Sequence, residues 1–249
     1  MPIISVSGHS RKVGKTSIAE GLIAALPEYG WTALKVSSHR HSGDSAEDYT
    51  VIEETSRDGA SDTSRFLKAG ALHAFWIQAE RIEAAVPAVR AVIKDAPFVI
   101  IEGNSVLDFI AADFSILVLN SGVAEFKKSA GSIIPRADAL VLIRESAKPG
   151  YFMGFQPLVG RKGVDTRRAQ RGRRRHTGQY VKETEQAQRT RHARLRARSR
   201  NPMKYPGKPS EWETILESAL LNTPSFKTGD PKIFPPALTE LLRSRLGNL

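Results

Sequence analysis

Apolar runs of strand length recur along the first 143 residues, and segments of helical periodicity separate them. The runs predict strands at residues 2–7, 32–36, 73–77, 98–101, 114–119 and 139–143. The spacing of apolar residues predicts helices at 14–26 and 80–94, and a short helix at 62–70. Because strands that alternate with helices form parallel sheets with right-handed crossovers, we expect a three-layer α/β fold with a mostly parallel sheet.

Three stretches depart from this alternation. Residues 37–61 are polar and predict a long loop with one helical turn. Residues 161–200 have almost no apolar periodicity, so they cannot bury enough surface to offset their ordering entropy, and we expect disorder there. Beyond them, short helices are predicted at 212–221 and 237–246. The second would have one apolar face, formed by Leu238, Leu241, Leu242 and Leu246.

The turn after the first strand has the sequence of a phosphate-binding loop. The strand ends near Gly8, Gly-Lys-Thr follows at 14–16, and a helical pattern comes next. In this order of strand, loop and helix, main-chain N–H groups surround a phosphate and the helix N-terminus adds its positive dipole. Gly14 would let the main chain approach, Lys15 would contact the β- and γ-phosphates, and Thr16 would hold Mg²⁺. The alternative is a Gly-rich turn with a solvated lysine.

The loop and the first residues after it are the predicted nucleotide-binding residues. They are Gly8, Arg11, Lys12, Val13, Gly14, Lys15, Thr16 and Ser17. Arg11 and Lys12 would add positive charge at the γ-phosphate or at a second anion, or would be solvated. Together with the predicted sheet, this turn indicates a P-loop NTPase domain at residues 1–147. A basic linker at 148–210 and a C-terminal helical segment at 211–249 would follow it.

Two further side chains belong to the edge of the sheet where open α/β folds build their sites. Glu102 directly follows the apolar strand 98–101, so its carboxylate would emerge beside Thr16 and hold Mg²⁺; the alternative is a surface glutamate. Lys35 lies at the end of the second strand. His39 and His41 follow it and have metal-ligand chemistry, but two histidines without a third ligand are a weak signal for a transition metal.

These motifs resemble two families of the SIMIBI class of P-loop NTPases, over residues 1–143. The five residues between Gly8 and Gly-Lys-Thr, the strand-end Lys35, and Glu102-Gly103 are similar to dethiobiotin synthetase. Lys35 with the later histidines, Asp62-Thr63-Ser64 leading to Ala-Gly-Ala, and Glu-Gly resemble molybdopterin-guanine dinucleotide biosynthesis protein B (MobB).

The resemblance implies roles for two of these side chains. Asp62 would be a second acid near Mg²⁺, and the alternative is a helix N-cap. Lys35 would be a catalytic residue beside Lys15 that faces the substrate or the γ-phosphate, and the alternative is a solvated lysine. The expected metal ligands are therefore Thr16, Asp62 and Glu102. No Asn/Thr-Lys-x-Asp motif follows the strand at 139–143, so the nucleotide is ATP or GTP.

Composition limits the kinds of metal site and the cellular compartment that we expect for the protein. The chain of 249 residues has no cysteine, which excludes disulfides and cysteine-based metal sites. No apolar run approaches the about 20 residues of a membrane span. The N-terminus has no basic leader, so we expect a cytoplasmic protein without a membrane partner.

The net charge of +11 is concentrated in one segment. Residues 161–204 carry 16 Lys and Arg against 3 Asp and Glu, so the rest of the chain has a net charge of only −2. An Arg-rich segment can bind RNA or DNA, although Tyr180 is its only aromatic residue. It can equally be a solvated linker, or the product of a shifted reading frame in G+C-rich DNA, which yields runs of Arg, Ala and Gly.

Three functions remain open from the sequence. The first is a Mg²⁺-dependent NTPase that resembles MobB and serves cofactor biosynthesis. The second is an ATP-dependent ligase or kinase like dethiobiotin synthetase, and the third is nucleic-acid binding through residues 161–204. The expected partners are a nucleoside triphosphate and a small-molecule substrate, and a homodimer is left open.

Overall fold

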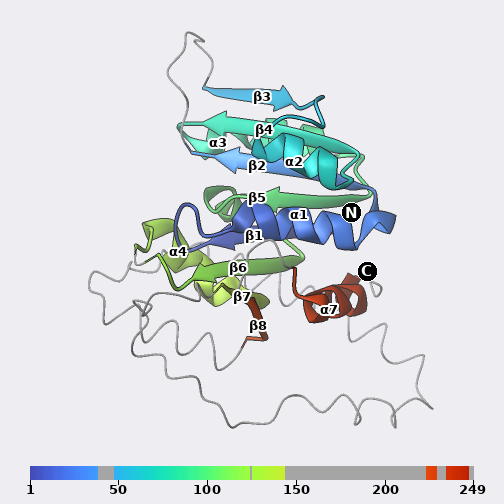
Figure 1. Ribbon diagram of the computed structural model, residues 1–249. Helices are drawn as coiled ribbons and strands as arrows, with labels where there is room; N and C mark the ends of the chain where they lie inside the picture. Colours follow the sequence, from blue (N-terminus) through green and yellow to red (C-terminus); the bar gives the residue numbers. More distant parts are fainter. Residues whose placement is uncertain (39–47, 124, 144–222, 229–233, 247–249) are drawn as a thin grey trace, which may run out of the picture. The chain divides into compact units, whose positions relative to one another are not determined.

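The computed structural model describes residues 1–38, 48–123, 125–143, 223–228 and 234–246, which form an eight-stranded sheet with helices (Figure 1). Its strands are β1 (Ile3–Gly8), β2 (Trp31–Ser37), β3 (Tyr49–Glu53), β4 (His73–Ala79), β5 (Phe98–Glu102), β6 (Phe114–Asn120), β7 (Ala139–Ile143) and β8 (Ser225–Thr228). Its α-helices are α1 (Lys15–Ala25), α2 (Asp62–Ala69), α3 (Ile82–Ile93), α4 (Lys128–Ile133) and α7 (Pro236–Leu246). Short 3₁₀ helices are η1 (Pro27–Tyr29), η2 (Ser105–Asp108) and η3 (Ile134–Arg136).

The sheet is parallel except at one edge. Its strand order is β3-β4-β2-β5-β1-β6-β7-β8, and β3 alone runs antiparallel to its neighbour. The central strand β1 pairs with β5 and β6, and its Val6 lies opposite Glu102 and Ile116. The α/β fold with a mostly parallel sheet is therefore confirmed.

The direction in which the chain crosses the sheet sorts its helices into two layers. The connections from β1 to β2, through α1, and from β2 to β4, which contains β3 and α2, both move toward the β3 edge. Through α3 and α4 the chain moves toward the β8 edge. Right-handed crossovers in opposite directions place their helices on opposite faces. Figure 1 accordingly shows α1 and α2 in front of the sheet and α3 behind it.

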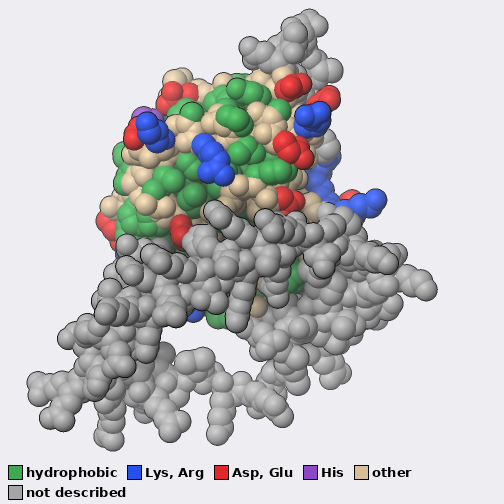
Figure 2. Space-filling model, turned by 180° about the vertical axis from the view of Figure 1, so that it is seen from behind, with side chains coloured by type: hydrophobic (Ala, Val, Ile, Leu, Met, Phe, Trp, Pro, Cys, Tyr) green, Lys and Arg blue, Asp and Glu red, His purple; other side chains and the backbone are tan. Residues whose placement is uncertain are grey.

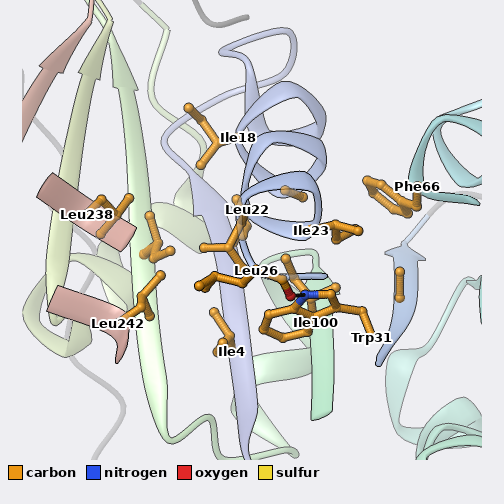
Figure 3. Close-up of a cluster of buried hydrophobic side chains, with 14 of the residues drawn as sticks. Ile4, Ile18, Leu22, Ile23, Leu26, Trp31, Phe66, Ile100, Leu238 and Leu242 are labelled. Carbon is orange, nitrogen blue, oxygen red and sulfur yellow. Dashed lines mark hydrogen bonds between the residues drawn. The ribbon is translucent and has the colours of Figure 1, made fainter. Parts of the chain in front are cut away.

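The core on the α1 side positions the start of that helix. Fully buried side chains of α1 pack against the central strands, and Leu238 and Leu242 of α7 join the same cluster (Figure 3). At one end Trp31 closes it, and its indole Nε1 donates to the carbonyl oxygen of Leu26 at 2.8 Å. Fully burying such an apolar side chain contributes about 1.5–3 kcal/mol. These contacts hold α1 against β1 and so define the turn between them.

Some expectations from the sequence are wrong or incomplete. Residues 37–61 are not only loop and helical turn, because β3 forms at Tyr49–Glu53. Val51 and Ile52 of β3 are 38% and 48% exposed, so this edge strand lacks the alternation that marks a half-buried strand. Helix α4 and strand β8 were not predicted, since each has too few residues to show a period.

Other expectations concern the C-terminal part. The helix at 237–246 is confirmed by α7, whose Leu238, Leu242 and Leu246 are buried and whose Leu241 packs against the core. The predicted disorder at 161–200, the linker at 148–210 and the helix at 212–221 lie outside the described residues, as do His39 and His41.

The surface behind the sheet is mixed in character. Figure 2 shows hydrophobic side chains in the middle of this face, with most charged side chains toward its margins. Among the described helices, none has both the length and the apolar composition needed to cross a bilayer.

Candidate functional site

The turn between β1 and α1 presents a row of main-chain donors. Lys12 and Gly14 both have left-handed backbone conformations, with φ of 56° and 96°. Such a turn directs successive N–H groups toward one side and forms a concavity for an anion. Helix α1 begins at Lys15, and its N-cap residue Gly14 makes no side-chain hydrogen bond to the first turn. The N-terminal end of α1 is thus built to receive negative charge.

Tight packing beneath the turn explains why residue 8 is a glycine. A Cβ atom on Gly8 would lie 2.5 Å from Cγ2 of the fully buried Val13 and 3.0 Å from Cδ of Lys15. Such a contact is too short for any side chain, so the turn can fold over β1 only when residue 8 is glycine.

His9 supports the turn from within the core. Its ring is fully buried and lies in a tilted arrangement against the Phe126 ring, with 4.5 Å between centroids. Its Nε2 is 2.9 Å from the carbonyl oxygen of Val123. Burial lowers the pKa of His9 and outweighs its hydrogen bonds to the carbonyls of Val123 and Val118, which act to raise it. The carbonyl of His9 in turn accepts from the N–H of Lys127 at 2.8 Å. In the sequence, His9 belongs to the predicted phosphate-binding loop, but in the structure it supports that loop from the core.

Asn104 is a residue that sequence analysis missed. Its Oδ1 accepts from the N–H of Gly8 at 3.1 Å, and its Nδ2 donates to the carbonyl oxygen of Gly8 at 2.8 Å. The amide therefore holds both main-chain groups of the first glycine. The neighbouring Gly103 is equally constrained, because its Cβ would lie 2.7 Å from the carbonyl oxygen of Val36. The signal in the sequence that could have identified Asn104 is its place as a polar residue directly after Glu-Gly at a strand end.

Lys15 lies at the carboxyl edge of the sheet and is partly exposed. Its Nζ donates to the carbonyl oxygen of Ser10 at 2.9 Å, within the same turn. Burial lowers the pKa of Lys15; Glu102 opposes this, and the charges of Lys35 and Lys127 add to it. Lys15 thus lies close enough to two further cationic groups to feel their charge, which favours an anionic ligand near the start of α1.

Two of the residues expected to bind Mg²⁺, one in α1 and one at the end of β5, meet directly. The hydroxyl of Thr16 donates to Oε2 of Glu102 at 2.9 Å, and the Glu102 side chain is only 4% exposed. β5 delivers Glu102 to this point because it pairs in register with β1 on one side and β2 on the other.

Lys35 and Asp62 complete the cluster. The ammonium of Lys35 contacts Oε1 of Glu102 at 3.1 Å and also Oδ2 of Asp62. Burial acts to lower the pKa of Lys35, but the two carboxylates outweigh it and raise that pKa. Burial acts to raise the pKa of Asp62, but Lys35 above all outweighs it and holds that pKa below its ordinary value. The solvated-lysine alternative for Lys35 is wrong.

The start of α2 leaves Asp62 available for this contact. The N-cap is Ser61, whose Oγ accepts from the N–H of Ser64 at 3.0 Å, so the N-cap alternative for Asp62 is also wrong. Arg65 then ties α2 to α1, because its Nη2 lies 2.5 Å from Oε2 of Glu20 and 3.1 Å from Oγ of Ser17.

The structure thus brings together the side chains of Lys15, Thr16, Lys35, Asp62 and Glu102 at one edge. The side chains of Arg11 and Lys12 are exposed on the turn, and that of Ser17 is engaged by Arg65. Within the described residues, no group of three or more His, Cys, Asp or Glu could hold a metal ion. The two carboxylates and the hydroxyl instead form an oxygen donor set, which suits Mg²⁺ when substrate oxygens complete its coordination.

No protein-family model matches the chain, and no curated protein matches it. Among solved structures, it is similar to the "apo" form of LpxK from Aquifex aeolicus, which is in complex with ATP. The two chains are 21% identical with a TM-score of 0.38, and the match covers 64% of this chain and 52% of LpxK. The chain thus spans about half the length of that protein. A similarity at this level does not identify an activity.

Proposed function

We propose that the protein is a P-loop NTPase that binds Mg²⁺ with a nucleoside triphosphate at the carboxyl edge of its sheet. One observation carries the proposal: the hydroxyl that follows Lys15 is hydrogen-bonded at 2.9 Å to a buried glutamate from the neighbouring strand. Both oxygens lie beside a turn in which Lys12 and Gly14 have left-handed conformations, a geometry that is typical of anion-binding main chain. In a surface turn with a solvated lysine, we would not expect a buried glutamate to accept a hydrogen bond from the hydroxyl that follows the lysine.

Each group at the site has a defined part in phosphate chemistry. The N–H groups of residues 12–17 would bind the β- and γ-phosphates, and Lys15 would exchange its bond to Ser10 for phosphate oxygens. Thr16, Glu102 and Asp62 would hold Mg²⁺, which supplies charge stabilisation to the phosphoryl group in transfer. Such electrostatic stabilisation, with little covalent chemistry by the protein, is how this class of site accelerates reaction.

We propose further that the chain belongs to the SIMIBI class and, like MobB, serves cofactor biosynthesis. The contact between the strand-end Lys35 and Glu102-Gly103 supports the class, because the same motifs carry the resemblance in the sequence. The alternative is a ligase or kinase like dethiobiotin synthetase. It is favoured by Lys35, which would face an anionic acceptor. An assay of nucleoside diphosphate formation with and without a carboxylate acceptor separates the two, because a ligase or kinase forms the diphosphate only with its acceptor.

The first test is calorimetric titration with ATP and with GTP, each with and without Mg²⁺. Wild type is expected to bind one of them, and Lys15→Ala is expected to bind it about a hundredfold more weakly, because a charge-assisted contact to phosphate is lost. Lys94→Ala, at an exposed position after α3, removes the same charge and is expected to leave binding unchanged. Wild-type affinity in Lys15→Ala, or no binding by wild type with Mg²⁺, would rule the proposal out.

A further inference from the structure

One ammonium group lies between the two carboxylates assigned to Mg²⁺. Nζ of Lys35 contacts Oε1 of Glu102 at 3.1 Å and Oδ2 of Asp62, while Oε2 of Glu102 accepts from Thr16 at 2.9 Å. The same three residues whose oxygens would hold the metal are thus joined into one network, and Lys35 supplies its positive charge. A compact, strongly charged ammonium is suited to this position.

The burial of Glu102 makes such a charge necessary. Its side chain is 4% exposed, and a carboxylate this far from water is costly unless it is paired. A divalent cation on the same oxygens would satisfy that need, and it would also repel the ammonium, since like charges at contact distance are unfavourable. Lys35 and Mg²⁺ are therefore alternatives for one position.

The geometry points to a built-in counter-ion: we propose that Lys35 occupies the metal position while the site is empty and leaves it when Mg²⁺ enters with the nucleotide. This inference rests on the proposed function and adds an exchange of cations to it. The side chains of Lys35 and Asp62 are 22% and 32% exposed, so the cluster opens to solvent on the Asp62 side. The flexible stem of Lys35 lets its ammonium turn from the carboxylates to the incoming phosphates or to an anionic second substrate.

The exchange has a consequence for the order of binding. Without nucleotide, Mg²⁺ must displace Lys35 with no phosphate to receive the ammonium, so the free metal binds weakly. With nucleotide, the phosphates supply further oxygen ligands for the metal and new contacts for Lys35. Metal and nucleotide are thus expected to bind together, and neither carboxylate is left unpaired at any stage.

The experiment measures Mn²⁺ binding to the full chain without nucleotide, by the electron paramagnetic resonance signal of free Mn²⁺. Lys35→Met is expected to bind Mn²⁺ about tenfold more tightly than wild type, because the competing charge is gone. Lys94→Met changes the net charge equally at a distant exposed site and is expected to match wild type. Lys35→Arg keeps the charge and is expected to bind weakly, as wild type does.

A second measurement does not depend on the stability of Lys35→Met. In wild type labelled with ¹⁵N-lysine, the Lys35 ammonium resonance, identified by its loss in Lys35→Arg, is expected to shift when Mg²⁺ and a non-hydrolysable nucleotide are added together. Equal Mn²⁺ affinity in folded Lys35→Met and wild type, or an unmoved Lys35 resonance, would overturn the inference. If wild type binds nucleotide in either case, the proposed function stands and only the exchange of cations is wrong. If nucleotide does not bind at all, both are wrong.

Discussion

Glu102 shows how one side chain takes its role from its neighbours. In the sequence it is a glutamate that follows an apolar strand, and a glutamate at the protein surface can stand in the same position. In the fold it is buried between Thr16 from the turn and Lys35 from β2. An ionised group in that position needs both partners, because the desolvation of a carboxylate is otherwise uncompensated. The residue is thus committed to holding a cation, whether that is Lys35 or a metal.

Asn104 gives a prediction at the same scale. Replacing it in Asn104→Ala leaves the N–H and carbonyl of Gly8 without their partners at 3.1 and 2.8 Å. Leaving buried polar groups unpaired costs about 1–3 kcal/mol, so urea denaturation is expected to show that loss of stability. Nucleotide affinity is expected to fall as well, since the turn starts at Gly8.

Asn120→Ala is the matched control. Its Oδ1 accepts from the N–H of Gly122 at 2.8 Å, a local contact after β6 rather than one to Gly8. It is expected to lose less stability and to keep nucleotide affinity. If Asn104→Ala binds nucleotide as tightly as wild type, Asn104 does not position the turn.

Helix α2 shows how an element places a functional group. Ser61 caps the helix, and Oε2 of Glu54 accepts from the Ser61 hydroxyl at 2.7 Å. Because the cap is supplied by Ser61, Asp62 can extend to Lys35 in β2. Arg65, one turn later, fixes α2 to α1 through Ser17 and Glu20. Helix α2 therefore places the carboxylate of Asp62 at the site, although Asp62 lies outside the turn between β1 and α1.

The pH dependence of stability tests this contact. Burial acts to raise the pKa of Asp62, but Lys35 above all outweighs it and holds that pKa below its ordinary value. Asp62 therefore stabilises the fold above its unfolded-state pKa, and this contribution disappears as the pH falls through the folded-state pKa. Asp62→Asn is therefore expected to be less stable than wild type at pH 7, and the difference is expected to shrink below about pH 4.

Urea denaturation of both proteins at several pH values measures that difference. Asp58→Asn, at an exposed position before α2, controls for the change in overall charge. A gap between Asp62→Asn and wild type that persists unchanged at pH 2–3, where ordinary carboxyls are protonated, would mean that the ion pair is not its source.

At the scale of the whole molecule, the C-terminal helix belongs to the same core as the site. Leu242 of α7 is fully buried in the cluster that includes Ile18 and Leu22 of α1. Leu242→Ala is expected to lower the free energy of unfolding by about 2–5 kcal/mol, because it leaves a cavity beside the helix that follows the turn. Chemical denaturation followed by circular dichroism measures this.

Arg243→Ala provides the comparison on the next residue. The guanidinium of Arg243 pairs with Glu28 at 3.0 Å, and both side chains are about half exposed. An exposed pair contributes about 0–1 kcal/mol, so this variant is expected to be nearly as stable as wild type. If Leu242→Ala costs no more than Arg243→Ala, α7 does not contribute to the core as described.

Much of the fold could be predicted because its signals are local. The parallel strands β1, β2, β5, β6 and β7 and the helix α1 are apolar at characteristic spacings, and each was anticipated within a few residues. Strands β3 and β8 were missed because an edge strand need not be apolar, and because four residues cannot show a period. Each of these strands forms because a neighbouring strand of the sheet supplies its hydrogen bonds.

By itself, the sequence determined the order of strand, glycine, Gly-Lys-Thr and helix, and with it the turn that leads from β1 into α1. These depend on residues adjacent in the chain, so backbone geometry alone decides them. Only the tertiary structure decided that Lys35 lies between Glu102 and Asp62, that Asn104 holds Gly8, and that α7 shares a core cluster with α1. Those contacts join residues far apart in the chain, and the register of the sheet and the packing of helices across it bring them together.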